Sequence, residues 1–537
     1  MNYKFLKETY IFYIFITITL FVLLYTHPFL RYPYDMFHHL IVMDNLYMQL
    51  THPIEKFTGI WANDFYIMLP TGEVEPLTLP RPRYLWHYIW AEIFVWFDID
   101  STQIFLRAKI IHLVQTVISL SSIYYFSNVI LRNIFKEIPT LQLCWLSLWS
   151  VFIWLTIYAT FSQLYHQVWM LWYSVNYQIT LPLFWYILGL TLVLLLEKTS
   201  WKIKLFFIFQ IILLTRFMLQ VHSMEFLYYL MHMVVFGLVF IDKVYLLLKR
   251  YFYLFIPLII AIIYMSKHYQ PEKSQIFKYL SWDKLPELYN KIMESGLWLV
   301  NGQNRAYASI NELMYFILYF AMVFVGYLLW KNYKKKTLNI EGRVLLYVML
   351  TSLFVLIPLY QFSGGLLSVI SRMNVVNRLY YSASLFVLIP LFSYAMFRKY
   401  KPQYMHLFIA LSLVLVVLFS KYSEVLHHNY YKNLSSIKQS FNKRKIGFNL
   451  SDTQIDVIKQ ELDTYEKNNH SSKPIQYYAR ADIAFILKYI YKKNVHWEGK
   501  FGGIDYKKNY NMNKNNQSFQ HILFEIPDEF PPFIPYK

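Results

Sequence analysis

The chain has 537 residues and a formal net charge of +19, and 57% of its residues are hydrophobic, 20% aromatic and only 15% charged. Soluble globular proteins carry roughly 25% charged residues, so this composition excludes an ordinary soluble enzyme and indicates a polytopic membrane protein. The single cysteine, Cys144, excludes an intramolecular disulfide, a zinc site built on several cysteines and an iron–sulfur cluster.

Eleven apolar runs of roughly membrane-spanning length predict transmembrane helices. The first is expected to be an uncleaved span, because no small-residue cleavage site follows it. Alternate connections are basic, from Lys4 and Lys7 to Arg398–Lys401, whereas the connection Phe161–Gln178 has no Lys or Arg. The positive-inside rule therefore predicts a cytoplasmic N-terminus and an extracytoplasmic C-terminus. The predicted spans are Tyr10–Thr26, Ile104–Leu131, Leu141–Tyr158, Ile179–Leu196, Ile203–Leu219, Glu225–Ile241, Tyr251–Met265, Leu313–Trp330, Val344–Tyr360, Leu379–Phe397 and Met405–Ser420.

The predicted fold is a predominantly α-helical membrane domain over residues 1–420, followed by a small α/β extracytoplasmic domain over residues 421–537. Two outward segments inside the membrane domain are long: loop 1, His27–Gln103, and a second loop, Ser266–Glu312. The basic balance is explained by cytoplasmic connections facing anionic lipid, so a lipid bilayer and no nucleic acid is expected as a partner. The apolar runs that predict the α/β fold are Ile455–Leu462, Ile475–Tyr478 and Ala481–Ile490.

Loop 1 concentrates acidic residues, with nine acidic and four basic side chains in an otherwise basic chain. Asp35 precedes apolar residues at three- and four-residue spacing, a pattern that predicts an interfacial helix. Asp35 is therefore the N-cap of that helix or a general base held at the membrane surface, and the two roles are compatible. His38 falls on its polar side, and His39 lies one turn after Asp35, beside that polar side. The apolar residues are Met36, Leu40, Met43, Tyr47 and Leu50.

Several further residues are candidates for binding or catalysis. Asp64 follows turn-rich sequence and is either a second functional carboxylate or part of the turn chemistry. Arg81 and Arg83, on either side of a proline, would clamp a phosphate or anchor the aromatic stretch that follows them in lipid headgroups.

Three other arginines lie where the positive-inside rule disfavours them or near the outer end of a span. Arg372 and Arg378 occupy a short outward connection, and Arg216 lies near the outer end of the fifth predicted span. Each would bind a lipid phosphate or pyrophosphate, or would anchor the chain in headgroups. Nucleotide-binding glycine loops and the zinc-protease motif HExxH are absent from the sequence, so a sugar donor is expected to be carried on a lipid.

Taken together, the first span, the acidic start of loop 1, the motif Asn377-Arg378-Leu379-Tyr380 before a late span and the polar C-terminal domain resemble the GT-C superfamily of integral-membrane glycosyltransferases. Arg107, at the mouth of the second span, is similar in position to a residue of that superfamily. The resemblance covers most of the membrane domain as an architecture, while its motifs are short. The C-terminal domain matches no known domain pattern.

The resemblance implies an inverting transferase of the inner (plasma) membrane whose active site faces outward. Its donor would be a polyprenyl phosphate-linked sugar, and its acceptor an extracytoplasmic glycan, lipid or protein. Asp35 would be the base, with His39 and Asp64 as further catalytic candidates. The chain lacks the adjacent acidic pair that some members use with a metal, so a requirement for Mg²⁺ or Mn²⁺ stays open, with His38 and Asp64 as candidate ligands. The lipid phosphate would be bound by Arg378, Arg372, Arg216, Arg81 and Arg83.

Two rival interpretations stay open. One is a surface-polysaccharide polymerase or ligase, although in that class the large loop typically comes late in the chain, whereas here it comes first. The other is a transporter of lipid-linked glycans without chemistry. The scarcity of ionisable residues in the middle of the spans and the long outward segments argue against that reading.

Overall fold

The computed structural model describes about half of the chain, and this part is mostly helical. The predicted spans Tyr10–Thr26, Tyr251–Met265 and Met405–Ser420, and all but isolated positions of Leu313–Trp330, lie outside the described residues. Apart from isolated positions, the described ranges are 34–51, 66–68, 74–76, 85–160, 177–221, 224–242, 284–298, 338–354, 361–370, 382–400, 452–468, 475–479, 481–489, 491–493, 495–497 and 520–525.

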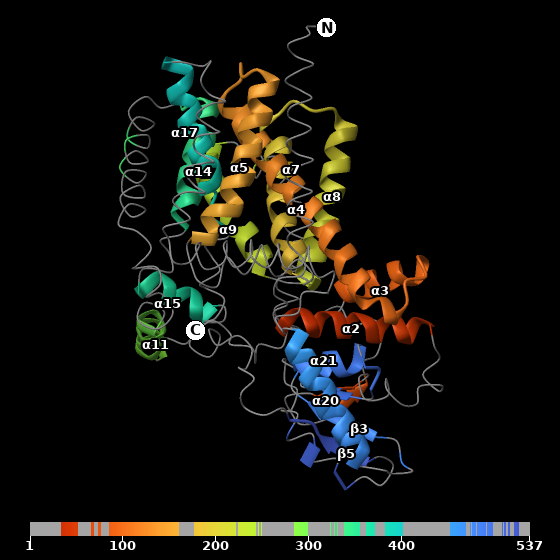
Figure 1. Cartoon of the computed structure of the whole chain (residues 1–537). Helices are drawn as coiled ribbons and strands as arrows, with labels where there is room; N and C mark the ends of the chain where they lie inside the picture. Colours follow the sequence, from red (N-terminus) through yellow and green to blue (C-terminus); the bar gives the residue numbers. More distant parts are fainter. Residues whose placement is uncertain are drawn as a thin grey trace, which may run out of the picture.

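A bundle of apolar helices forms the upper part of the molecule in Figure 1. Three stretches in it are long and apolar enough to cross a membrane: Leu106–Ile134, Ile179–Leu196 and Trp201–Val221. The membrane character predicted from composition is thus supported, while the number of eleven spans and their orientation stay predictions. The bundle helices are α4 (Ile104–Ile134), α5 (Thr140–Thr160), α7 (Tyr177–Leu196), α8 (Trp201–Val221), α9 (Met224–Val239), α14 (Ile340–Ser352) and α17 (Leu385–Tyr400).

Aromatic side chains fill the interior of the bundle. Trp185 of α7 is fully buried, with its ring centroid 4.7 Å from that of Phe126 on α4 and 4.9 Å from that of Phe386 on α17. Helices α4 and α7 approach closely at Gly189, where an added Cβ would stand 2.8 Å from the ring of Tyr125. By contrast, most side chains of α8 are exposed although they are apolar, as expected of a helix that faces lipid.

Ion pairs join the helix ends at one end of the bundle. Arg132, at the end of α4, donates from Nε and Nη2 to the two carboxylate oxygens of Glu197, which follows α7, at 2.8 and 2.9 Å. Lys136 lies 3.2 Å from Glu341 in the first turn of α14. The predicted topology assigns all these helix ends to the cytoplasmic side, and that orientation stays a prediction.

The start of α17 differs from the sequence prediction. The span was expected to begin at Leu379, whereas the helix begins at Leu385 and is preceded by an irregular turn, Ser382–Ser384. All three residues of this turn are fully buried. A buried turn is compatible with an apolar bundle only when other groups satisfy its backbone hydrogen bonds.

Loop 1 forms two helices and a small antiparallel sheet. Helix α2 (Tyr34–Thr51) lies across the lower end of the bundle in Figure 1, next to α3 (Leu85–Trp96). Leu40, Met43 and Tyr47 of α2 are buried, as their spacing predicted, but His39 and Asp44 of the same helix are buried too, so the interfacial position of α2 stays a prediction. The remaining elements of loop 1 are β1 (Tyr66–Met68), β2 (Val74–Pro76) and the 3-10 helix η4 (Ser101–Gln103).

Two further helices pack against each other beside the bundle. Helix α11 (Leu285–Trp298) comes from the predicted second loop, and α15 (Gln361–Ile370) from the outward connection before α17. The side-chain amide of Gln361 donates to the backbone oxygen of Met293 at 2.9 Å.

The C-terminal lobe is built around a three-stranded parallel sheet with the order β4-β3-β5. It has a hydrophobic cluster of its own, which includes Ile458, Tyr477 and Phe524. The small sheet with helices confirms the α/β character expected of this segment. The elements of the lobe are α20 (Asp452–Asn468), β3 (Ile475–Ala479), α21 (Ala481–Tyr489), β4 (Val495–Trp497) and β5 (Gln520–Leu523).

Candidate functional site

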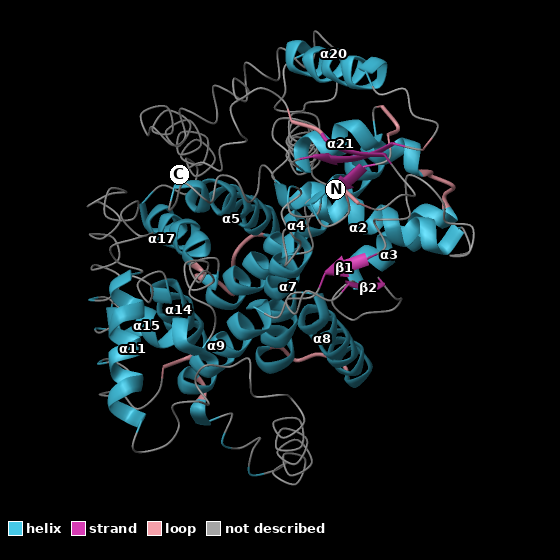
Figure 2. Ribbon diagram, turned by 90° about the horizontal axis from the view of Figure 1, so that it is seen from below, coloured by secondary structure: helices cyan, strands magenta, loops and turns pink. Residues whose placement is uncertain are grey.

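Three segments that are far apart in the sequence meet at the lower end of the bundle. Helix α21 of the C-terminal lobe packs on α2, and α2 in turn contacts the start of α4. Figure 2, seen from this end, shows α21 beside α2 while α20 lies farther out. We call the polar contacts at this meeting point the Asp44 junction. It consists of Asp44, Tyr47, Ile99, Arg107, Lys488 and Tyr489.

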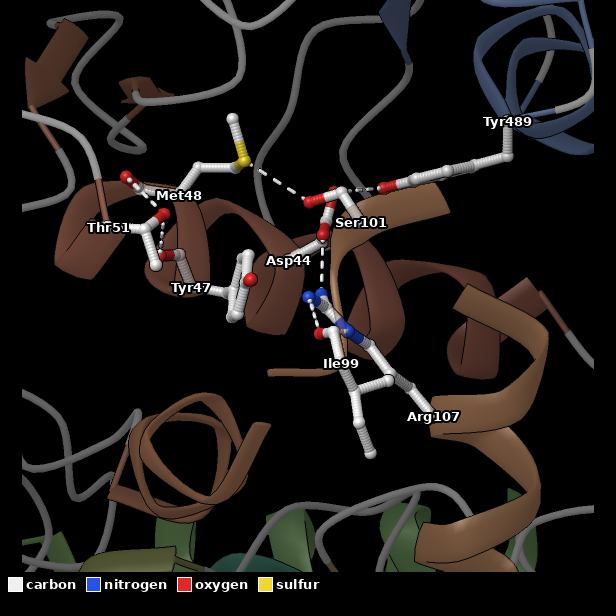
Figure 3. Close-up of polar contacts among 8 residues, drawn as sticks. All are labelled: Asp44, Tyr47, Met48, Thr51, Ile99, Ser101, Arg107 and Tyr489. Atoms are coloured by element: carbon white, nitrogen blue, oxygen red, sulfur yellow. Dashed lines mark hydrogen bonds and ion pairs between the residues drawn. The ribbon is translucent and has the colours of Figure 1, made fainter. Parts of the chain in front are cut away.

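The centre of the Asp44 junction is a buried ion pair between α2 and α4. Arg107 Nη1 donates to Asp44 Oδ1 at 2.6 Å, and both side chains are fully shielded from solvent. Arg107 also donates from Nε and Nη2 to the backbone oxygen of Ile99, at 3.0 and 2.5 Å (Figure 3). Its guanidinium carbon lies 3.9 Å from the ring centroid of Tyr47. A buried guanidinium is stable only with partners of this kind.

The second oxygen of the same carboxylate holds the C-terminal lobe. The Tyr489 hydroxyl donates to Asp44 Oδ2 at 3.0 Å, as Figure 3 shows. Burial, followed by the nearby Asp44 charge, raises the pKa of Tyr489 well above its usual range. The phenol therefore stays protonated and remains a donor to the carboxylate. One side chain of α2 thus connects the membrane bundle to the lobe.

A buried lysine lies next to this contact. Lys488 is 5% exposed, and its Nζ lies 5.6 Å from the ring centroid of Tyr489. Burial lowers the pKa of Lys488 from 10.5 to about 7, while the charge of Asp44 acts in the opposite direction. Lys488 adjoins Tyr489, which contacts Asp44, so we expect the protonation of this amine to change when the contact between α21 and α2 opens.

A second buried polar contact holds α2 against α3. His39 Nδ1 lies 2.7 Å from His87 Nε2, and the two rings stack with centroids 4.9 Å apart. Trp86 Nε1 donates to the side-chain oxygen of Gln115 on α4 at 2.7 Å. Together with the Asp44 junction, these contacts fix α2 on two sides.

The chemistry open to the Asp44 junction is limited by its geometry. Both oxygens of Asp44 accept hydrogen bonds in a site without solvent exposure, so this carboxylate is not available to remove a proton from a substrate. Its effect is positional, since it fixes the helix whose first turn contains Asp35. Another loop-1 acid, Glu92, accepts a hydrogen bond from the Tyr88 hydroxyl at 2.6 Å within α3.

The structure covers the predicted site residues only in part. Asp35 is the second residue of α2, but its side chain and that of His38 are outside the described part of the structure. His39 is buried against His87 instead of facing an open surface, and its catalytic role stays a prediction. The other predicted residues outside the described part are Asp64, Arg81, Arg83, Arg372 and Arg378.

Arg216 is described, and it lies on an exposed part of α8. Glu225, which the sequence places close to it, is buried in the first turn of α9. An exposed arginine on a lipid-facing helix suits headgroup contact, whether with a membrane lipid or with a lipid-linked donor. Among the described side chains, no group of three or more His, Cys, Asp or Glu residues could hold a metal ion, and the candidate ligands His38 and Asp64 are not among those side chains.

Sequence analysis did not single out Asp44, Lys488 and Tyr489. Arg107 was noticed only for its position at the mouth of a span. The signal for the ion pair was an arginine at the start of a long apolar run, which needs a buried acid nearby, but nine acids of loop 1 qualified equally. Searches against protein-family models and curated proteins found no match for this chain.

Proposed function

We propose that this chain is a membrane glycosyltransferase that moves a sugar from a polyprenyl phosphate to an extracytoplasmic acceptor with inversion at the anomeric carbon. The observation that supports it most is the gathering of α2, α3 and the C-terminal lobe at one end of an apolar bundle, with Asp35 in the first turn of α2. A lipid-linked donor has its tail in the bilayer and its sugar phosphate at the surface, which is where α2 would lie.

In the proposed reaction the Asp35 carboxylate accepts the proton of an acceptor hydroxyl. The oxygen then forms a bond to the anomeric carbon while the bond from that carbon to the phosphate oxygen breaks on the opposite face. The polyprenyl phosphate leaves with the electron pair, and Arg378, with Arg372, Arg216, Arg81 or Arg83, would stabilise its developing charge. His39 and Asp64 are further candidates for the proton transfer. A requirement for Mg²⁺ or Mn²⁺ is tested by chelation and metal add-back.

The rigidity of α2 supports the role of Asp35 in this scheme. A general base must be held within hydrogen-bond distance of the hydroxyl that it deprotonates. The Asp44–Arg107 ion pair and the His39–His87 contact fix α2 against α4, a helix of the bundle, and against α3, which contacts α8. Asp35 therefore begins a helix whose position is set by buried contacts.

The experiment is a comparison of surface-glycan profiles, by gel and mass spectrometry, between a deletion strain and strains rescued at matched membrane expression. The rescuing variants are wild type, Asp35→Asn, Arg378→Ala and the control Asp98→Asn. Helix α2 begins at Tyr34, so Asp35 lies in its first turn and is not its N-cap. Asn has nearly the same size as Asp, so Asp35→Asn removes the base and keeps the shape of the side chain. Asp98 is an exposed loop-1 acid with a φ of 50°, a conformation that Asn tolerates, so its replacement changes the loop charge by the same amount.

The proposal requires that deletion removes a sugar, that Asp98→Asn restores it and that Asp35→Asn and Arg378→Ala do not. Washing wild-type membranes with a chelator and adding back Mg²⁺ or Mn²⁺ then reports whether a metal takes part. Full rescue by Asp35→Asn would mean that Asp35 is a residue of the first turn of α2 without a catalytic role. Loss of chain length in the glycan without loss of a sugar would favour a polymerase or ligase, and an unchanged profile on deletion would contradict an enzymatic role in surface glycans.

A further inference from the structure

A histidine lies in the middle of the bundle and uses both of its ring nitrogens. His232 of α9 is fully buried. Its Nε2 lies 2.6 Å from the backbone oxygen of Ser382, and its Nδ1 lies 2.7 Å from the hydroxyl oxygen of Tyr347 on α14. Ionisable residues inside an apolar bundle are costly, so one that is held this completely is expected to have a task.

The hydrogen bonds determine which nitrogen carries the proton. The Ser382 oxygen is a carbonyl and can only accept, so Nε2 must be the donor. In a neutral imidazole Nδ1 is then an acceptor, and it accepts the proton of the Tyr347 hydroxyl. The neutral form suits an interior in which a charge would be left without water.

The partner of His232 is the irregular turn ahead of α17. Because Ser382–Ser384 is not α-helical, its backbone lacks the full set of α-helical hydrogen bonds, and the interior of an apolar bundle has no water to replace those that are missing. His232 supplies the donor for the Ser382 carbonyl. On the other side of the turn, the Ser384 hydroxyl lies 2.5 Å from the Thr351 hydroxyl and donates to the backbone oxygen of Val348 at 3.0 Å.

Aromatic rings prevent His232 from turning away from this partner. Its ring centroid lies 5.3 Å from that of Phe184, 5.5 Å from Trp185 and 5.2 Å from Phe354, in each case edge to face. Phe184 and Trp185 come from α7, and Phe354 lies just after the end of α14, so two segments outside α9 enclose the histidine. The direction of the Nε2–H bond is therefore set by packing as well as by hydrogen bonding.

We propose that His232 is a positioning residue that holds the buried turn Ser382–Ser384 and so fixes where the chain just ahead of α17 enters the bundle. Arg378 lies four residues before Ser382 in the sequence. Where the proposed glycosyltransferase function holds, His232 therefore acts on the donor phosphate through Arg378. The second brace, from Ser384 to Thr351 and Val348, acts on the same turn from α14.

The test measures the position of this segment without relying on activity. In a Cys144→Ser background, which leaves no native cysteine, Val376→Cys is labelled from outside with a membrane-impermeant maleimide in whole cells. The full-length variants are His232→Leu, which removes the donor, His232→Gln, which keeps a donor at the position of Nε2, and Thr351→Val, which removes the second brace. The control is Tyr229→Phe, since Tyr229 also lies on α9 but its hydroxyl bonds to Thr191 of α7 and not to the turn.

We expect His232→Leu to change the labelling rate about tenfold, because it leaves the buried Ser382 carbonyl without its donor. We expect Thr351→Val to change the rate in the same direction but by less, because the Ser384 hydroxyl keeps its hydrogen bond to the Val348 carbonyl. We expect His232→Gln and Tyr229→Phe to label as wild type does. If the donor is a polyprenyl phosphate sugar, His232→Leu also raises its KM about tenfold and leaves the acceptor KM unchanged. All variants are first checked for monodisperse elution, and Thr351→Val serves if His232→Leu does not fold.

Wild-type labelling rates in folded His232→Leu and Thr351→Val would overturn the inference, whatever the activity. An equal change in Tyr229→Phe would also overturn it, because the effect would then be a general loosening of the bundle. Changed labelling rates in His232→Leu and Thr351→Val, together with full activity of Arg378→Ala, would support the positioning role of His232 and contradict the proposed role of Arg378 in binding the donor phosphate. A failure of the inference on His232 can therefore be told apart from a failure of the proposed function.

Discussion

The Asp44 junction predicts a large and localised effect of one substitution. In Asp44→Asn the side chain keeps its size, but the buried Arg107 loses its counter-charge. Removing one partner of a fully buried ion pair costs about 3–5 kcal/mol. Tyr489→Phe removes one hydrogen bond to a carboxylate, which costs about 1.5–3 kcal/mol. Each 1.4 kcal/mol corresponds to about a factor of ten in an equilibrium constant. The equilibrium constant for local opening is therefore expected to rise about a hundredfold or more in Asp44→Asn and about tenfold or more in Tyr489→Phe.

Hydrogen–deuterium exchange of the full-length protein in lipid nanodiscs separates the two contacts. Asp44→Asn is expected to raise exchange of amides in both α2 and α21 about a hundredfold, because the carboxylate holds both helices. Tyr489→Phe is expected to raise exchange in α21 alone. Strand β3 serves as the internal control, since the lobe keeps its own hydrophobic cluster.

Two results would refute this reasoning. Exchange in α2 of Asp44→Asn within about twofold of wild type would mean that the ion pair does not hold the helix. An equal rise in β3 would mean that the lobe unfolds instead of undocking. A complementary variant, Asp44→Leu with Arg107→Met, is expected to exchange more slowly than Asp44→Asn, because an apolar pair leaves no buried charge.

Three further predictions follow from described contacts. Burial lowers the pKa of Lys488, so between about pH 7 and 10.5 the docked lobe binds fewer protons than the undocked lobe. Protection of α21 amides from hydrogen exchange is therefore expected to rise with pH in that window and to be independent of pH below it. A pH dependence that persists in Lys488→Met would contradict this assignment. An alanine at Gly189 would meet the Tyr125 ring at 2.8 Å, so Gly189→Ala is expected to lower the stability in detergent by about 1–3 kcal/mol. The control Gly237→Ala, with nothing within 4 Å of the added Cβ, is expected to be neutral or stabilising. Equal shifts of the melting temperature in the two variants would show that the close approach of α4 and α7 does not contribute to stability. Trp96 and Phe97 are 81% and 71% exposed at the end of α3, which is expected to lie at the bilayer surface. A spin label at Trp96→Cys in the Cys144→Ser background is therefore expected to collide more often with oxygen, which partitions into lipid, than with a water-soluble nickel complex, and a label at Lys467→Cys in the C-terminal lobe is expected to show the reverse. Frequent collisions with nickel at both sites would contradict the position of α3 at the bilayer surface.

Much of the local structure was predictable from the sequence. The apolar runs that became α4, α7 and α8 are long enough to fix a helix by length and composition alone. The spacing of Leu40, Met43 and Tyr47 predicted the buried face of α2, because side chains three and four residues apart share one side of a helix. The apolar runs near the C-terminus were sufficient to indicate a small α/β unit.

The break before α17 was not predictable in this way. Residues Ser382–Ser384 fall inside an apolar run, and hydropathy alone continues the helix through them. The turn is held from other helices: His232 donates to the Ser382 carbonyl, and Thr351 contacts the Ser384 hydroxyl. Nothing in the local sequence records those partners.

The same limit applies to the choice of Asp44 among the acids of loop 1. Amphipathic pattern and charge are properties of neighbouring residues, and they determined that loop 1 would carry helices and acidic side chains at the membrane. Which acid is buried depends on Arg107, 63 residues away, and on Tyr489, 445 residues away. Only the packing of α2 between α4 and α21 brings those groups within hydrogen-bond distance, because the cost of burying each charge is recovered only where its partner is also buried.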